Sequence, residues 1–224
     1  MLRDNSIKPF VIDIANNKFE SDDFLKTDIL IVNIPFKDVL AFSELVKKVA
    51  QSTVSHVIFI SSTSVYGDKE GLVSEECDDD LATHPLLDIE ALFTSNKHFT
   101  TTVVRFAGLI GPQRNPAKFF KNNKVVNSPE SQVNMIHRED CINIINLIIE
   151  KEKWNGTYNA CADTHPTKTD FYTYVATISG LPIPTFSNNT NSGNKIVNNH
   201  KIKKELNYCF LYPNLLELNV LDIT

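Results

Sequence analysis

The sequence has 224 residues, of which 42% are hydrophobic and 22% are charged, and its formal net charge is −5. This length and composition suit a globular protein, either one large α/β domain or one domain with a small lobe. A negative charge without a stripe of Lys and Arg argues against a nucleic-acid partner, and no apolar run approaches membrane-spanning length.

Short apolar runs alternate with helical patterns along the chain, which predicts a parallel sheet with crossover helices. Strands are expected at 10–14, 29–33, 56–60, 101–106 and 156–160. Helices are expected at 36–51, 85–96, 139–151, 168–179 and 201–206. The stretch 68–83 is too acidic for a core element, and 182–200, rich in Asn, Ser, Thr and Pro, is expected to be a long surface loop. On the helix at 139–151 the buried stripe is expected to include Cys141, Ile142, Ile145, Ile148 and Ile149.

The cysteines and the N-terminus bear on metal binding and localisation. None of Cys77, Cys141, Cys161 and Cys209 belongs to a C-x-x-C pair, so neither a zinc site nor a redox dithiol is indicated and no metal is expected. The polar N-terminus does not have the pattern of a signal peptide. We therefore expect a cytoplasmic protein with reduced thiols.

Three motifs carry a family resemblance. The run Ser61-Ser62-Thr63-Ser64-Val65-Tyr66-Gly67 is similar to the S-S-x-x-V-Y-G stretch of the extended short-chain dehydrogenases/reductases, which include nucleotide-sugar epimerases and dehydratases. The segment 105–112, which ends in Gly-Pro, resembles the turn after the next strand of that family, and 134–140 resembles its H-x-x-D helix start.

The order and spacing of further motifs are similar to an atypical branch of that family, the YeeZ-like proteins. The chain has G-P-x-R-x-P at 111–116, Val-Asn at 133–134, C-A-x-x-H-P at 161–166 and Phe-Tyr at 171–172. The resemblance runs over nearly the whole chain. It implies a Rossmann-like parallel sheet, truncated at its N-terminus, over residues 1–160 and a small C-terminal substrate lobe over 161–224.

The same resemblance bears on the cofactor. The family opens with a G-x-G-x-x-G loop whose backbone holds the pyrophosphate of NAD or NADP. The chain starts about where the second strand of the family would end, so the loop is missing. Binding of NAD or NADP would then need the front unit as part of a longer working protein, or an unusual site; the remaining alternative is that cofactor binding has been lost. The strands near Val11 and Ile31 would then expose an edge or pair differently.

The resemblance also implies candidate site residues. Ser62 is the candidate catalytic hydroxyl; the alternative is a strand-end serine that bonds to local backbone. The candidate cofactor contacts are Asp13, Asn33, Ile34, Pro35, Ser61, Thr63, Phe106, Ala107 and Gly108. The candidate substrate contacts are Arg114, Asn134 and His165, with an exposed loop arginine and a loop-fixing histidine as the alternative interpretations.

The catalytic Tyr-x-x-x-Lys pair of the family is not present in this chain. The alignment places Ala82 and Leu86 at those two positions, and neither side chain can exchange a proton. Two functions therefore stay open. One is an NAD(P)-dependent epimerase/dehydratase-like oxidoreductase acting on a sugar nucleotide or related polar small molecule. The other is a non-catalytic ligand-binding or interaction protein on the same scaffold. The family also implies a homodimer formed through the helices at 36–51 and 85–96.

Overall fold

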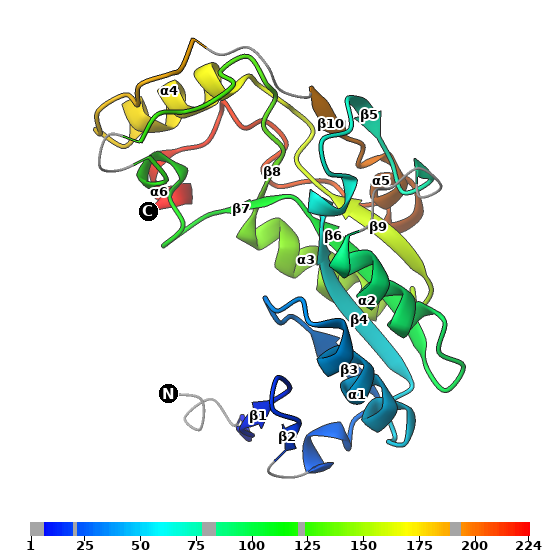
Figure 1. Ribbon diagram of the computed structural model, residues 1–224. Helices are drawn as coiled ribbons and strands as arrows, with labels where there is room; N and C mark the ends of the chain where they lie inside the picture. The colour runs from blue at the N-terminus through cyan, green and yellow to red at the C-terminus, as the bar shows by residue number, and fades with distance from the viewer. Residues whose placement is uncertain (1–6, 20–21, 78–83, 121–123, 189–193) are drawn as a thin grey trace. The chain divides into compact units, whose positions relative to one another are not determined.

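The computed structural model describes residues 7–19, 22–77, 84–120, 124–188 and 194–224 (Figure 1). The chain forms two compact units. Unit 1 consists of Met1–Ser61, Thr83–Val103 and Lys153–Gly156, and unit 2 of Ser62–Ala82, Val104–Glu152 and Thr157–Thr224. Neither unit is one continuous segment. The predicted domain boundary after residue 160 stays a prediction.

A four-stranded sheet confirms the predicted α/β fold. Its strand order is β3 (Ile29–Val32), β4 (His56–Ser62), β6 (Thr100–Phe106) and β9 (Gly156–Ala160). β3 pairs with β4 in parallel, with Ile29 opposite His56. The apolar, β-branched runs that predict these strands lie where the strands do. β3 stands at one end of the order, so β4 is its only partner among the described strands.

Two helices cover an aromatic core in unit 1. Helix α1 (Val39–Ala50) begins where the Asp38 carboxylate accepts a hydrogen bond from the Ala41 backbone N–H at 3.0 Å. Helix α2 (Pro85–Thr94) has Pro85 in its first turn, where a missing N–H costs nothing. Phe59 and Phe93 stack at 5.0 Å between ring centroids. Burial of these rings holds the helices against the sheet.

The expected strand at 10–14 is shorter than predicted and lies outside the four-stranded sheet. Its strand part, β1 (Ile12–Asp13), pairs antiparallel with β2 (Lys18–Phe19), and η2 (Asp22–Leu25) follows. Asn17, with φ of 50°, turns the chain back on itself, and asparagine tolerates this left-handed conformation. The local hairpin therefore replaces pairing with a distant strand.

Unit 2 contains the remaining elements. They are η3 (Thr63–Tyr66), β5 (Gly71–Val73), β7 (Gly108–Ile110), η5 (Pro116–Lys118), β8 (Met135–His137), α3 (Arg138–Glu150), α4 (Lys168–Ile178), β10 (Lys195–Val197), α5 (His200–Leu206) and α6 (Val220–Ile223). β7 pairs with β8 in parallel. The apolar core of this unit includes Ile110, Phe171, Val175 and Leu215, each fully buried.

Two stretches that the sequence predicts as irregular each contain a strand. β5 and β10 lie side by side in parallel, with Lys195 opposite Gly71 (Figure 1). Each strand is three residues long and flanked by polar residues, so neither shows a periodicity of its own. The prediction that 68–83 holds no core element was wrong at β5, and the prediction of a surface loop over 182–200 was wrong at β10, because the pairing of these strands is non-local.

The predicted buried stripe of α3 was wrong at Ile142 and omitted Ile144, which is fully buried. Ile142 is 49% exposed, whereas Asp140 is fully buried in its place. The Asp140 carboxylate accepts hydrogen bonds from the Tyr208 hydroxyl at 2.6 Å and from the backbone N–H groups of Leu211 and Tyr212. Hydrophobic periodicity cannot predict the burial of a carboxylate whose hydrogen bonds come from distant residues.

Candidate ligand-binding site

The carboxyl end of β4 carries the candidate catalytic hydroxyl. Ser62 is the last residue of β4, and its Oγ accepts a hydrogen bond from the Ser64 backbone N–H at 3.1 Å, which caps η3. Parallel sheets bind ligands at the carboxyl ends of their strands. No acceptor among the described residues takes the hydroxyl hydrogen of Ser62, so the hydroxyl has a donor to offer a ligand. Its catalytic role stays a prediction.

The tyrosine of the same motif is locked into a buried polar cluster. The Tyr66 hydroxyl donates to Asn159 Oδ1 at 2.8 Å and accepts a hydrogen bond from Arg105 Nη1 at 3.0 Å. Both Tyr66 and Arg105 are 1% exposed. Burial raises the pKa of Tyr66 to about 12, against the opposing effect of the Arg105 charge. Tyr66 is therefore poorly suited to exchange protons near neutral pH.

The carboxylate of Glu75 is bonded to the backbone of this cluster. Glu75, 8% exposed, accepts a hydrogen bond from the Asn159 backbone N–H at 2.6 Å. Desolvation raises the pKa of Glu75 above its ordinary value, although this hydrogen bond and the charges of Lys201 and Arg105 act in the opposite direction. The cluster fixes the loop after β4 against β9, both within unit 2.

Gly67 ends η3 with a backbone that favours glycine. Its φ is 54° and its ψ is −135°, a combination that side chains of L-amino acids avoid. Its carbonyl accepts a hydrogen bond from Lys195 Nζ at 2.7 Å. The motif thus ends in a turn that presents a carbonyl to β10.

The predicted cofactor contacts around β4 are buried or already bonded. The Ser61 hydroxyl donates to the Glu90 carboxylate at 2.5 Å, and both residues are buried. Thr63 is 7% exposed. The Ser61 hydroxyl is therefore used within the protein and Thr63 is little exposed, and contact of either residue with a cofactor stays a prediction.

The other predicted cofactor contacts of unit 1 are accessible. Asn33, Ile34 and Pro35 directly follow β3 and are exposed. Asp13, in β1, accepts hydrogen bonds from the backbone and side chain of Asn16, which lower the pKa of its carboxyl. The residues after β3 have the exposure that a ligand contact requires, whereas Asp13 closes a local turn.

Two of the three predicted cofactor contacts of unit 2 bond through their backbone to neighbouring segments of the chain. Phe106 and Ala107 are buried, and the Ala107 N–H donates to the Ala160 carbonyl at 3.0 Å. The Gly108 N–H donates to the Asn134 carbonyl at 3.0 Å. A Cβ on Gly108 would lie 2.5 Å from the sulfur of Met135, so a side chain here would displace Met135. The close approach of β7 and β8 therefore explains why position 108 carries a glycine.

The predicted substrate contacts have protein partners. Arg114 Nε donates to the Leu109 carbonyl at 2.8 Å, and the rest of its exposed guanidinium lies 5.9 Å from the Phe119 ring centroid. Burial lowers the pKa of His165 below its usual value, and its Nδ1 is buried without a hydrogen-bond partner among the described residues. Burial therefore disfavours the charged form of His165, and one ring nitrogen is without a partner among the described residues.

Asn134 holds a strand. Its Nδ2 donates to the Lys195 carbonyl at 2.9 Å, and its Oδ1 accepts from the Val197 N–H at 2.8 Å. Both ends of the amide are thus used on the backbone of β10. Substrate contact through Asn134 stays a prediction, but the geometry gives it a positioning function that its motif did not reveal.

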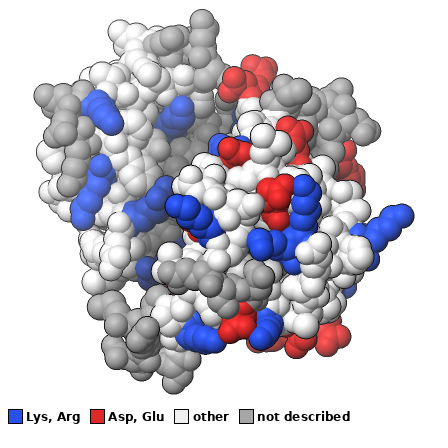
Figure 2. Space-filling model, turned by 60° about the horizontal axis from the view of Figure 1, so that its bottom comes forward, with Lys and Arg blue, Asp and Glu red and all other residues white. Residues whose placement is uncertain are grey.

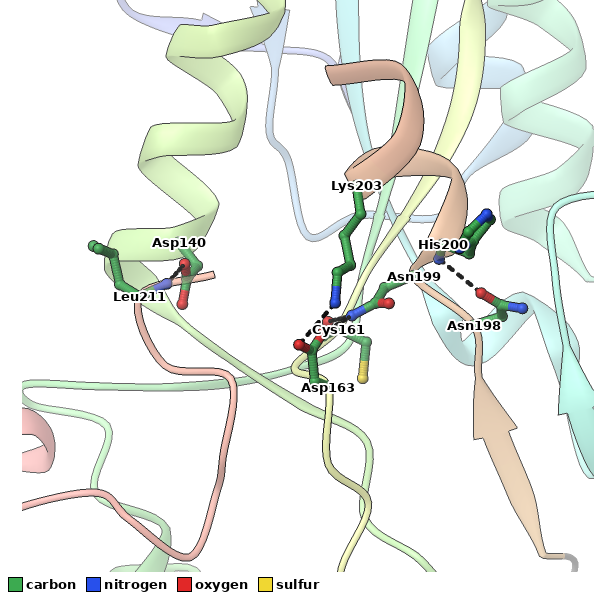
Figure 3. A network of polar contacts seen from close by, with 8 residues as sticks. All are labelled: Asp140, Cys161, Asp163, Asn198, Asn199, His200, Lys203 and Leu211. Atoms are coloured by element: carbon green, nitrogen blue, oxygen red, sulfur yellow. Dashed lines mark hydrogen bonds and ion pairs between the residues drawn. The ribbon is translucent and has the colours of Figure 1, made fainter. Parts of the chain in front are cut away.

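The segment after β9 is tied to α5 by a second polar network (Figure 3). Asp163 accepts from Asn199 Nδ2 at 2.7 Å and forms an ion pair with Lys203 at 2.8 Å, and Asn199 also donates to the Cys161 carbonyl. Asn199 precedes α5 and Lys203 lies within it. The network holds α5 close to the C-A-x-x-H-P segment.

The two positions that align with the family's Tyr-x-x-x-Lys pair offer no proton relay. Ala82 lies outside the described residues. Leu86 is 7% exposed in the first turn of α2, where its N–H donates to the His84 ring at 3.2 Å. None of the six tyrosines in the sequence is followed four residues later by a lysine.

Comparison with known proteins decides the family. The chain is 34% identical to Protein YeeZ of Escherichia coli K12 over 212 residues, which cover 88% of this chain and 77% of that protein. The chain belongs to the YeeZ family. The same identity and coverage hold for YeeZ of E. coli O157:H7. No protein-family model matches.

Solved structures share the fold of this YeeZ homologue. A functionally unknown conserved protein from Silicibacter pomeroyi has a TM-score of 0.78 at 24% identity, covering 96% of this chain and 82% of that chain. UDP-glucuronic acid 4-epimerase from Bacillus cereus, in complex with UDP-glucuronic acid and NAD, has a TM-score of 0.74 at 19% identity, covering 96% and 81%. The fold is therefore that of the NAD-dependent epimerases and dehydratases.

The residues of this YeeZ homologue fit the NAD of those neighbours only in part. Within unit 1, the stretch after β3 is exposed as a ligand contact requires. By contrast, the Ser61 hydroxyl donates its hydrogen bond to Glu90, and Tyr66 is buried. We therefore derive no chemical step through a nicotinamide.

The described residues contain neither a cluster of metal ligands nor a membrane-spanning helix. No group of three or more His, Cys, Asp or Glu side chains there could hold a metal ion. No helix within those ranges has the length and apolarity to cross a membrane.

Sequence reasoning missed Lys69, Lys168 and Lys195, which line a cavity of about 180 Å³ in unit 2. Each stands alone in the sequence, far from the other two, so no charge run marks them. The pairing of β5 with β10 brings them together, and that pairing was not predicted.

Proposed function

We propose that this chain binds a nucleoside-diphosphate sugar or a related polar small molecule without performing the Tyr/Lys chemistry of the short-chain dehydrogenases. The proposal rests on the residues at, and nearest to, the positions of the family's proton-transferring tyrosine and lysine. Leu86 occupies the lysine position, and Tyr66, the tyrosine of the β4 motif, is bonded to Arg105 and Asn159 in the interior. Standard hydride chemistry needs a phenol that ionises readily, and burial raises the pKa of Tyr66 instead.

The ligand class comes from the fold. Structures of this fold are known in complex with UDP-glucuronic acid, UDP-glucose and NAD. A scaffold can keep a ligand cleft after its catalytic groups are lost, because binding and chemistry depend on different side chains.

One observation favours a second candidate, an NAD(P)-dependent epimerase/dehydratase-like oxidoreductase. The hydroxyl of Ser62 keeps an unused donor at the carboxyl end of β4, which is where the family would place a reacting oxygen. NAD or NADP would be the cofactor of such an enzyme.

Titration calorimetry of the full chain with UDP-glucuronic acid and UDP-glucose tests the first candidate. We expect saturable binding, and no conversion of the sugar when NAD or NADP is added and the products are followed by NMR. Absence of saturable binding to both sugar nucleotides would overturn the proposal. Turnover that disappears in Ser62→Ala would instead establish the second candidate.

A further inference from the structure

The cavity in unit 2 is lined by an unusual set of lysines. Its walls are Gly67, Asp68, Lys69, Ser131, Gln132, Asn134, Lys168 and Lys195. All three lysines are partly buried, whereas the aspartate is exposed. Most lysines of the described chain are exposed, as expected for a strongly hydrated ammonium group. Partial burial of three lysines around one cavity therefore needs a reason.

Two of these lysines, Lys168 and Lys195, are bonded to neutral carbonyl oxygens. Lys195 Nζ donates to the Gly67 carbonyl at 2.7 Å, and Lys168 Nζ donates to the Asn127 carbonyl at 3.0 Å. Neither forms an ion pair with a carboxylate among the described residues. An ammonium has three hydrogens, so each keeps donors for a further acceptor. Burial lowers the pKa of both groups, and at Lys195 the charge of Asp68 acts in the opposite direction.

The rest of the wall is rigid and polar. Asn134 fixes the backbone of Lys195 through two hydrogen bonds, and the Lys168 N–H is fixed by the Ser131 carbonyl at 2.8 Å. Gln132 Oε1 is buried without a partner in the described part of the chain. Because the two ends of an amide are interchangeable in such assignments, this buried end is equally able to donate as an N–H.

The charges around the cavity are opposite to those of the whole chain. Three lysines and one aspartate line it, in a protein whose net charge is −5. On the face drawn in Figure 2, Asp and Glu side chains stand beside several groups of Lys and Arg. An excess of lysines over carboxylates in one cavity suits a dianion, because each additional ammonium stabilises phosphate oxygens.

We propose that this cavity is a phosphate-binding site, formed by Lys69, Lys168 and Lys195, that takes the diphosphate of the sugar-nucleotide ligand. This inference rests on the proposed function for the identity of the ligand. The recognition of phosphate rests on the lysines and the cavity alone.

Titration calorimetry of the full chain tests the site with pyrophosphate, UDP and uridine. We expect pyrophosphate and UDP to bind and uridine to bind far more weakly. Lys168→Met and Lys195→Met should each weaken pyrophosphate about tenfold, the loss of one charge-assisted hydrogen bond. Lys48→Met, which removes a partly buried lysine from unit 1, should leave the affinity unchanged. Affinities within twofold of the unchanged protein in both folded cavity variants would overturn the site.

A second measurement needs no substitution. Acylation of lysines, mapped by mass spectrometry, should be suppressed at Lys168 and Lys195 by pyrophosphate and unchanged at exposed Lys118. Equal acylation with and without pyrophosphate would contradict the site.

The two proposals fail in different ways. If pyrophosphate binds and protects the lysines while UDP-glucuronic acid and UDP-glucose do not bind, the phosphate site stands and the proposed function falls. If UDP-glucuronic acid binds equally to the unchanged protein and to both lysine variants, the proposed function stands and the phosphate site falls.

Discussion

The hydroxyl of Tyr66 is a structural group. It links Asn159 to the buried guanidinium of Arg105, so its removal leaves the Asn159 acceptor unsatisfied in the interior. We expect Tyr66→Phe to lower the free energy of unfolding by about 2 kcal/mol, measured by urea denaturation. Tyr172→Phe is the matched control. Tyr172 is also buried, but its hydroxyl has no hydrogen-bond partner among the described residues. Equal effects of the two substitutions would contradict a structural function for the Tyr66 hydroxyl.

Glu75 should make stability depend on pH. Because desolvation raises its pKa in the folded state, the folded protein binds more protons than the unfolded chain between the ordinary pKa of 4.5 and the raised value. Stability contributed by Glu75 is therefore fully present below pH 4.5 and lost as the pH rises through this window.

Replacing Glu75 by Gln removes the titration and keeps an oxygen for the Asn159 N–H. We expect the stability of Glu75→Gln relative to the unchanged protein to rise between pH 4.5 and 7, measured by thermal unfolding. Glu130→Gln, at an exposed site, is the control and should show no such rise. A constant difference across this pH range for Glu75→Gln would contradict the assignment.

Sequence patterns placed residues well at some positions and poorly at others. Ser62 lies at the carboxyl end of β4 as its motif predicts. The roles of Ser61 and Asn134 were not readable, because a motif gives the position of a side chain but not its partner. Glu90 and the backbone of β10, which bond to them, are distant in the sequence.

At the scale of elements, the amide of Asn134 holds β10 in addition to its pairing with β5. Asn134→Ala removes both hydrogen bonds that this side chain makes to the backbone of β10. We expect faster amide hydrogen exchange at Val197, because local opening becomes less costly. Exchange in β8, which carries its own pairing with β7, should change little. Unchanged protection of Val197 would show that β5 alone holds β10.

β3 is an edge strand with an apolar side chain in solvent. Ile31 is 44% exposed, and an unpaired edge is a template for association with another chain. We expect Ile31→Lys to reduce concentration-dependent self-association, measured by analytical ultracentrifugation, without lowering the melting temperature. The predicted homodimer involves α1 and α2 instead. If Ile31→Lys leaves association unchanged, the edge is not responsible.

Elements with strong local signals were predictable. β4 and β6 are continuous runs of apolar and β-branched residues, and α1 has a capping aspartate and an apolar face. β5 and β10 are too short for a periodicity, and their stability comes from pairing across a long sequence separation. Sequence reasoning therefore found the sheet and missed the part of unit 2 that builds the lysine cavity.

At the scale of the whole molecule, the chain carries separate optical probes for its two units. The single tryptophan, Trp154, lies in unit 1, stacked on His56 at 4.2 Å, whereas all six tyrosines lie in unit 2. Because both units are assembled from interleaved segments, we expect tryptophan fluorescence and tyrosine absorbance to report one unfolding midpoint in urea. Two separated midpoints would show that the units unfold independently.

Gly67 has a consequence for chemical synthesis of this protein. No atom lies within 4 Å of the place where a Cβ would stand, so space does not exclude a side chain. The backbone conformation disfavours an L-residue, because φ of 54° and ψ of −135° are the mirror image of the extended conformation that L-residues prefer. A D-alanine introduced at position 67 by semisynthesis would suit this backbone, whereas its natural enantiomer would oppose it.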